Sequence, residues 1–109
     1  MLKPIALHIL LALADRDGHG YALMQAIREQ SGGEVPVHTA SFYRHLNMLI
    51  EEGLVAEAAG RRDGDDPRRG AYYRITPRGR RALEDEKQRL MDLVAQMKKI
   101  RFAPRKAEV

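Results

Sequence analysis

Residues 39–53 read TASFYRHLNMLIEEG, and this stretch decides the fold. Its apolar side chains recur at the spacing of a helix, at Phe42, Leu46, Leu49 and Ile50. Thr39 suits the N-cap, because its hydroxyl can accept a hydrogen bond from a free backbone N–H. Gly53 is placed to end the helix. We therefore expect a helix over residues 40–52 with a polar outward face.

Two further short helices are expected before this one. Pro4 fits the first turn of a helix, where its missing N–H costs nothing, and it opens a predicted helix over residues 3–15. The apolar face of the second helix is predicted at Tyr21, Leu23, Met24 and Ile27. This helix should end before the Ser-Gly-Gly run at 31–33. The glycines on either side of His19 predict only a tight connection between the two helices.

A hairpin is expected after the third helix. Residues 54–57 and 71–75 are apolar and β-prone, which favours two paired strands. The loop between them is too charged to bury. It carries four arginines, Arg61, Arg62, Arg68 and Arg69.

A long helix is expected at the C-terminal end. Thr76 suits its N-cap and Pro77 its first position, so the sequence predicts a helix from 77 to about 102, roughly 38 Å long. An apolar heptad seam follows its length, at Leu83, Leu90, Leu93, Met97 and Ile100. Glu86 interrupts this seam near its start.

These elements predict a mostly α fold with a small β-hairpin, in the order of a winged helix-turn-helix. We expect the DNA-binding domain to comprise residues 1–76, the C-terminal dimerisation helix 77–103, and a flexible tail 104–109. The length of 109 residues leaves little room for a further domain.

The positive charge is concentrated in the middle of the chain. Lys and Arg number 19 against 15 Asp and Glu, a net charge of +4. Residues 54–82 hold eight arginines against four acidic residues, which is also a net of +4. Arginine donates two hydrogen bonds to a phosphate at once, so a polyanionic partner is indicated. An ordinary solvated surface is the alternative that charge alone leaves open.

Several classes of protein are excluded. The absence of cysteine excludes a disulfide framework, an iron–sulfur cluster and a zinc finger, and it fits a cytoplasmic location. The apolar stretches are too short to span a membrane. The histidines lie on four different elements without a recurring metal-ligand spacing, at His8, His19, His38 and His45. We therefore expect no metal, no cofactor and no enzymatic activity.

The outward face of the third helix predicts the DNA contacts. Arg44 and Asn47 are expected to read base edges, and Ser41 and Tyr43 to contact phosphates, with His45 also at the flank of the helix. The full set of predicted DNA-binding residues is Thr39, Ser41, Tyr43, Arg44, Asn47, Arg61, Arg62, Arg68, Arg69 and Arg74. The solvent side of any amphipathic helix could look similar. A protein-interaction module without sequence-specific DNA binding is the alternative function.

The seam of the last helix predicts a two-fold dimer, which would place two recognition helices on one face of the DNA. The predicted interface residues are Ile5, Ile9, Leu83, Leu90, Leu93, Val94, Met97 and Ile100. A hydrophobic effector could enter between this helix and the first helix of the other subunit, near Ile5 and Ile9.

Four motifs resemble the PadR family of transcriptional regulators: HGY at 19–21, FYRHL at 42–46, EEGLV at 51–55 and RRGAYYRITPRG at 68–79. The resemblance covers roughly residues 5–100 and is closest to the short subgroup with a single C-terminal helix. It implies a homodimeric repressor that binds a pseudo-palindromic operator and is released by a small molecule. Some short members stack planar drugs on a tryptophan of the last helix, whereas this chain has no tryptophan.

Overall fold

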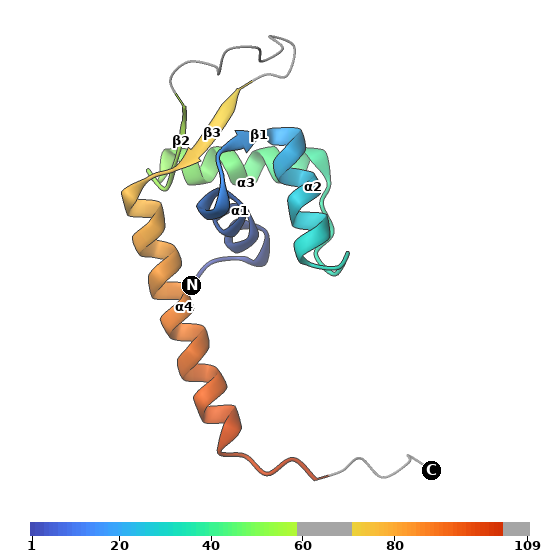
Figure 1. The fold of residues 1–109 in the computed structure, drawn as a ribbon, viewed down its shortest axis with the longest axis vertical. Coiled ribbons are helices and arrows are strands. Elements are labelled where there is room, and N and C mark those ends of the chain that lie inside the picture. The colour runs from blue at the N-terminus through green and yellow to red at the C-terminus, as the bar shows by residue number, and fades with distance from the viewer. Residues whose placement is uncertain (59–70, 104–109) are drawn as a thin grey trace.

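The computed structural model describes residues 1–58 and 71–103. The four predicted wing arginines, Arg61, Arg62, Arg68 and Arg69, and the predicted tail 104–109 lie outside the described residues. The described elements are α1 (Pro4–Asp15), β1 (Gly18–His19), α2 (Gly20–Gln30), α3 (Thr39–Glu51), β2 (Val55–Glu57), β3 (Tyr72–Ile75) and α4 (Pro77–Lys98), arranged as in Figure 1.

The sheet has three antiparallel strands in the order β1-β3-β2. β2 and β3 form the expected pair, with Val55 opposite Ile75. The third strand, Gly18–His19, was not expected, because two residues are too few to show an alternating pattern. His19 nevertheless pairs with Tyr72, and its Nδ1 lies 3.2 Å from the carbonyl oxygen of Ala71. The predicted connection between the first two helices is thus also the edge of the sheet.

The core lies between α1, α2, α3 and the sheet. Its fully buried side chains are Ile9, Leu10, Leu13, Ile27, Phe42, Leu46 and Val55. They come from all three helices and from β2, so the helical faces predicted from the apolar spacing meet in one cluster. The mostly helical winged fold is therefore confirmed.

The two ends of α3 differ in how well they were predicted. The N-cap is His38 without a side-chain hydrogen bond, so the prediction that Thr39 is the cap was wrong. Phe42 N already donates to His38 O at 2.8 Å, which places Thr39 in the first turn. Gly53 ends the helix as predicted, with a φ of 78° that favours glycine.

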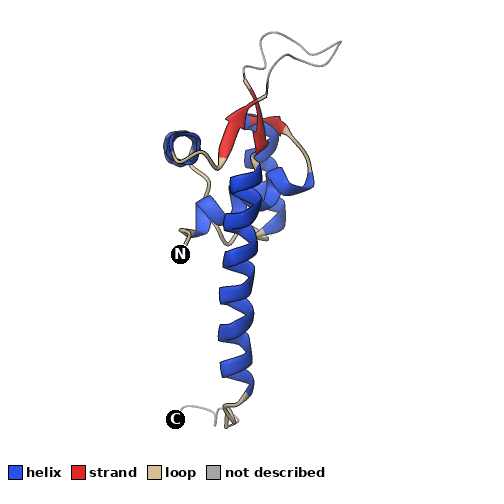
Figure 2. Cartoon of the chain, turned by 90° about the vertical axis from the view of Figure 1, so that its left-hand side faces the viewer, coloured by secondary structure: helices blue, strands red, loops and turns tan. Residues whose placement is uncertain are grey.

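α4 begins as predicted and ends earlier. The Thr76 hydroxyl accepts a hydrogen bond from Gly79 N at 3.0 Å and donates to Gly53 O at 2.6 Å. The helix ends at Lys98 instead of about 102. Its first half packs against α1 and β3, and its second half projects away from the rest of the chain (Figures 1 and 2). Within residues 1–58 and 71–103, no helix combines the length and apolar character needed to cross a membrane.

Glu86 explains the interruption of the apolar seam. Its side chain is only 4% exposed. The carboxylate accepts a hydrogen bond from Leu2 N at 3.1 Å and two from Arg89, at 2.6 and 3.0 Å. The hydrogen bonds from Arg89 lower the pKa of Glu86 to about 2, and the bond from Leu2 adds to this effect. A buried carboxylate therefore fastens α4 to the residues that lead into α1.

Candidate nucleic-acid interface

α3 presents one buried and one exposed face. Phe42, Leu46 and Leu49 are buried in the core. The opposite face is exposed and includes four of the predicted DNA-binding residues, Thr39, Tyr43, Arg44 and Asn47, together with Ala40 and Met48. A helix that enters the major groove needs such a face, with an Arg and an Asn available for base edges.

Ser41 and His45 lie at the edge of this face and interact with each other. His45 Nδ1 is 2.8 Å from the carbonyl oxygen of Ser41 and 3.5 Å from its hydroxyl. His45 is only 9% exposed, so the expectation that its imidazole reaches a phosphate was wrong. The ring completes the buried side of the helix instead. Ser41 is half-buried beside it.

Tyr43 connects α3 to the start of α2. Its ring makes an edge contact with Phe42, with centroids 5.1 Å apart. Its hydroxyl lies so close to Gly20 that a Cβ at that position would collide with it. The glycine is therefore needed for close approach and not for an unusual backbone angle. Two motifs that are distant in sequence, HGY and FYRHL, meet at this contact.

Tyr21 and Gln25 form a polar pair on α2, and they were not among the predicted site residues. Tyr21 is 67% exposed, so the prediction that it belongs to the apolar face of this helix was wrong. Gln25 Nε2 donates a hydrogen bond of 2.8 Å to its hydroxyl. The i, i+4 spacing of a tyrosine and a glutamine was the available signal, since such pairs face each other on a helix.

Arg74 is the described arginine of the predicted wing. It is exposed on β3, between the buried side chains of Tyr73 and Ile75. Burial raises the pKa of the Tyr73 hydroxyl, and nearby Glu57 adds to the increase. The alternation along β3 thus assigns Tyr73 to the core and Arg74 to the solvent.

The predicted dimer residues fall into three groups. Five are on the exposed part of α4 or just beyond its end: Leu90, Leu93, Val94, Met97 and Ile100, each between 39 and 56% exposed. Leu83 and Ile5 are half-buried against the core. Ile9 is 0% exposed, so its assignment to an interface was wrong. It faces the core of its own chain because it lies opposite the solvent side of α1.

The three helices, the three-stranded sheet and the exposed polar face of α3 define a winged-helix DNA-binding fold. A family model described as the transcriptional regulator PadR-like family matches residues 9–85. The chain belongs to this family. It is therefore a transcription regulator and not an enzyme, as the sequence predicted, and PadR-like regulators bind DNA.

Several solved structures share the fold. A PadR family transcription regulator from Clostridium difficile superposes with a TM-score of 0.74 at 22% identity, over 89% of this chain and 97% of that chain. A transcriptional regulator from Clostridium thermocellum has a TM-score of 0.72 at 22% identity, over 88% of each chain. TM0937, described as a potential transcriptional factor, is 31% identical over 87% of this chain and 82% of its own, with a TM-score of 0.69. No curated protein matches the chain.

Proposed function

We propose that this protein is a sequence-specific repressor that binds a pseudo-palindromic operator in double-stranded DNA as a homodimer in the cytoplasm. A hydrophobic small molecule is proposed to release it. The observation that carries the proposal is the exposed face of α3, which brings Thr39, Tyr43, Arg44 and Asn47 together beside the winged sheet. Major-groove readout requires a helix whose exposed face carries such polar and cationic side chains while its other face packs in the core.

Each side chain of this face has a proposed role. Arg44 and Asn47 hydrogen-bond to base edges, since both present paired polar atoms to them. Thr39, Ser41 and Tyr43 contact phosphates and fix the register of the helix. Arg74 and the wing arginines Arg61, Arg62, Arg68 and Arg69 add phosphate contacts beside the groove.

The dimer is proposed to form through α4. The apolar side chains on its projecting half are too exposed for a helix that acts alone. A second copy related by two-fold symmetry would cover Leu90, Leu93, Met97 and Ile100 and set two α3 helices on one side of the duplex. An effector would change DNA affinity only if it preferred one spacing of those helices.

The test starts with operator fragments selected from genomic DNA by the purified protein. Arg44→Ala should lose about 1–3 kcal/mol of discrimination between the selected operator and random DNA in fluorescence anisotropy. Arg101→Ala removes the same charge from an exposed position beyond the end of α4 and serves as the control. If Arg44→Ala discriminates as well as the parent, the proposed docking of α3 is wrong.

A protein-interaction module is the second candidate, because the exposed apolar side chains of α4 would also suit a protein partner. A salt titration separates the two functions. Phosphate contacts release counterions, so the affinity of a DNA-binding protein falls steeply with salt. An interaction module should show little affinity for DNA at any salt concentration.

A further inference from the structure

Met48 is a large apolar side chain on the otherwise mostly polar outward face of α3. It is 42% exposed, and it does not pack on the core of the described residues, whereas nearby Ile50 does. A single exposed apolar side chain needs no explanation on an ordinary surface. Met48 needs one, because it lies on the face of α3 that is proposed to meet base edges in the major groove.

Met48 forms a row of exposed side chains with Ala40 and Arg44. The three residues are four apart in the sequence, and residues at this spacing lie on the same side of a helix. Asn47 is exposed beside the row, about one turn after Arg44. Side chains of a helix lean toward its N-terminus, so Met48 covers the turn that holds Arg44 and not the end of α3. Its thioether therefore belongs to the same surface as the two side chains proposed to read bases.

The length of this row matches a short run of base pairs. α3 rises about 12 Å from Ala40 to Met48, which is about three and a half steps between stacked base pairs. Beyond Met48, the exposed residues Glu51 and Glu52 are acidic, and phosphates would repel them. The part of α3 that suits DNA thus ends at Met48. The row has an apolar side chain at each end and a cation between them.

We propose that Met48 and Ala40 contact thymine methyl groups on either side of the base pair that Arg44 reads. Among the four bases, only thymine presents a methyl group in the major groove, and apolar side chains are the groups that recognise it. Burying the methyl against an apolar side chain removes both from water, and methionine adapts its shape to an irregular partner. This specificity rests on the proposed function, because it requires that α3 enters the major groove.

Deoxyuridine provides the test, because it pairs as thymidine does and lacks only the C5 methyl group. Each thymine of one operator half-site is replaced in turn, and the dissociation constant is measured by fluorescence anisotropy. For the parent chain, each contacted methyl group that is lost should weaken binding about fourfold. Met48→Gln should bind the thymine and deoxyuridine duplexes equally at one of these positions. Ala40→Gly should do so at a different position.

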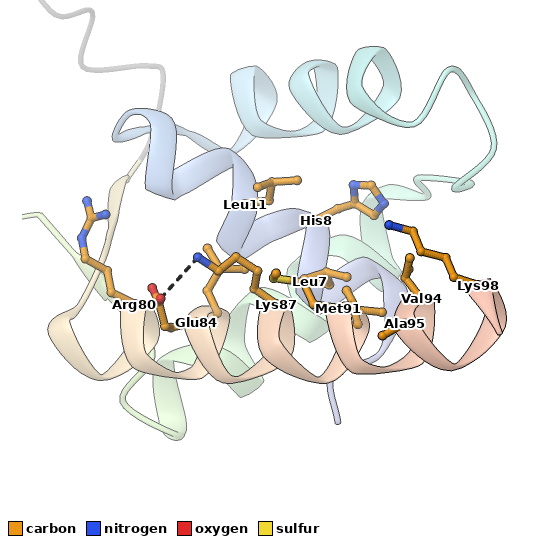
Figure 3. Close-up of a pocket in the computed structure, with 12 residues that line it drawn as sticks. Leu7, His8, Leu11, Arg80, Glu84, Lys87, Met91, Val94, Ala95 and Lys98 are labelled. Carbon is orange, nitrogen blue, oxygen red and sulfur yellow. Dashed lines mark ion pairs between the residues drawn. The ribbon is translucent and has the colours of Figure 1, made fainter.

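Two further variants serve as controls. Met48→Leu keeps an apolar side chain and should retain the preference for thymine. Met91→Gln makes the same chemical change at a methionine that is 57% exposed and lines a groove between α1 and α4 (Figure 3). It should keep the preference of the parent at every position. The readout is the ratio of two affinities for one variant, so a uniform loss of affinity or stability does not alter it.

Two results would each overturn the proposal. The first is that the parent binds every deoxyuridine duplex as tightly as the operator. The second is that Met48→Gln or Ala40→Gly keeps the full preference of the parent at every position, which would assign the effect of deoxyuridine to DNA shape. The same assay compares the operator with random DNA. A parent that separates these two but ignores the methyl groups leaves the proposed DNA function intact, whereas one that does not separate them contradicts both.

Discussion

Glu86 shows how one side chain can look misplaced in a sequence and still be needed by the fold. It falls on the apolar seam of α4, where a charge should cost stability. Three hydrogen bonds from Leu2 and Arg89 satisfy the carboxylate and keep it ionised. At this position of the seam, Glu86 therefore links α4 to Leu2 near the N-terminus.

The pH dependence of stability should reveal this contact. The pKa of Glu86 falls from 4.5 to about 2 on folding, so the unfolded chain binds this proton first as the pH falls. The stabilising contribution is complete above pH 4.5 and is lost as the pH falls toward 2. Urea unfolding across that range should therefore show a smaller acid-induced loss of stability for Glu86→Gln than for the parent.

Glu84→Gln is the control for that experiment. Glu84 pairs with Lys87 on the surface, and its side chain is 73% exposed. Such pairs contribute little to stability. Its pH profile should follow that of the parent, and an equal flattening in both variants would contradict the role given to Glu86.

The residues of the candidate site show where sequence patterns reach their limit. Helical spacing was enough to place Arg44 and Asn47 on the solvent side of α3. It could not distinguish a polar residue at the edge of a face from one inside it, which is why His45 was placed wrongly. Tyr21 was misplaced for the converse reason, because an aromatic ring with a hydroxyl fits either side. The burial of His45 and the exposure of Tyr21 both depend on side chains that other helices and strands place beside them.

The start of α4 depends on a close approach between elements. Gly79 is buried, and a Cβ there would collide with the carbonyl oxygen of Leu54 and come within 2.7 Å of Ile75 Cγ1. Gly79→Ala should therefore lower the free energy of unfolding by about 1–3 kcal/mol, although alanine is the better helix former. Arg81→Ala in the same turn is exposed and should change it by less than about 0.5 kcal/mol. Equal stability of both variants would show that the contact can relax.

The edge of the sheet is another element that local sequence could not predict. β1 has only two residues, and its extended backbone exists because β3 pairs with it. The third helix was predicted well because apolar side chains at helical spacing over several turns indicate a helix without any knowledge of the tertiary structure. Its first residue was not, since the choice between Thr39 and His38 as the cap depends on the path of the preceding chain.

The wing is expected to supply affinity without sequence preference. Each phosphate contact that is lost should flatten the slope of log K against log salt by about 0.9. Arg74→Ala should therefore reduce the slope by about one contact, and the Arg68→Ala/Arg69→Ala pair by about two. Arg101→Ala should leave it unchanged. An unaltered slope for the double variant would mean that these arginines remain in solvent in the complex.

At the scale of the whole molecule, the proposed dimer would allow two α3 helices to act together on DNA. Leu90→Glu with Leu93→Glu should place charges in the proposed interface, dissociate the dimer and abolish operator binding. Gln88→Glu with Lys99→Glu adds negative charge on the opposite face of α4 and at its C-cap, and it should leave the dimer intact. Sedimentation measures both. A parent chain that is monomeric at tens of micromolar would contradict the dimer.

We expect the projecting α4 to act as a lever arm that pivots at the Glu86 contact. From Glu86 to Lys98 the helix rises about 18 Å, so a tilt of about 10° at the pivot moves the far end by about 3 Å. If the far ends are held together in a dimer, the same tilt moves the two α3 helices relative to each other. The stiffness of one carboxylate contact would then set how much variation in half-site separation the protein tolerates. Glu86→Gln should accept operators lengthened by one base pair that the parent rejects, and equal rejection by both would place the pivot elsewhere.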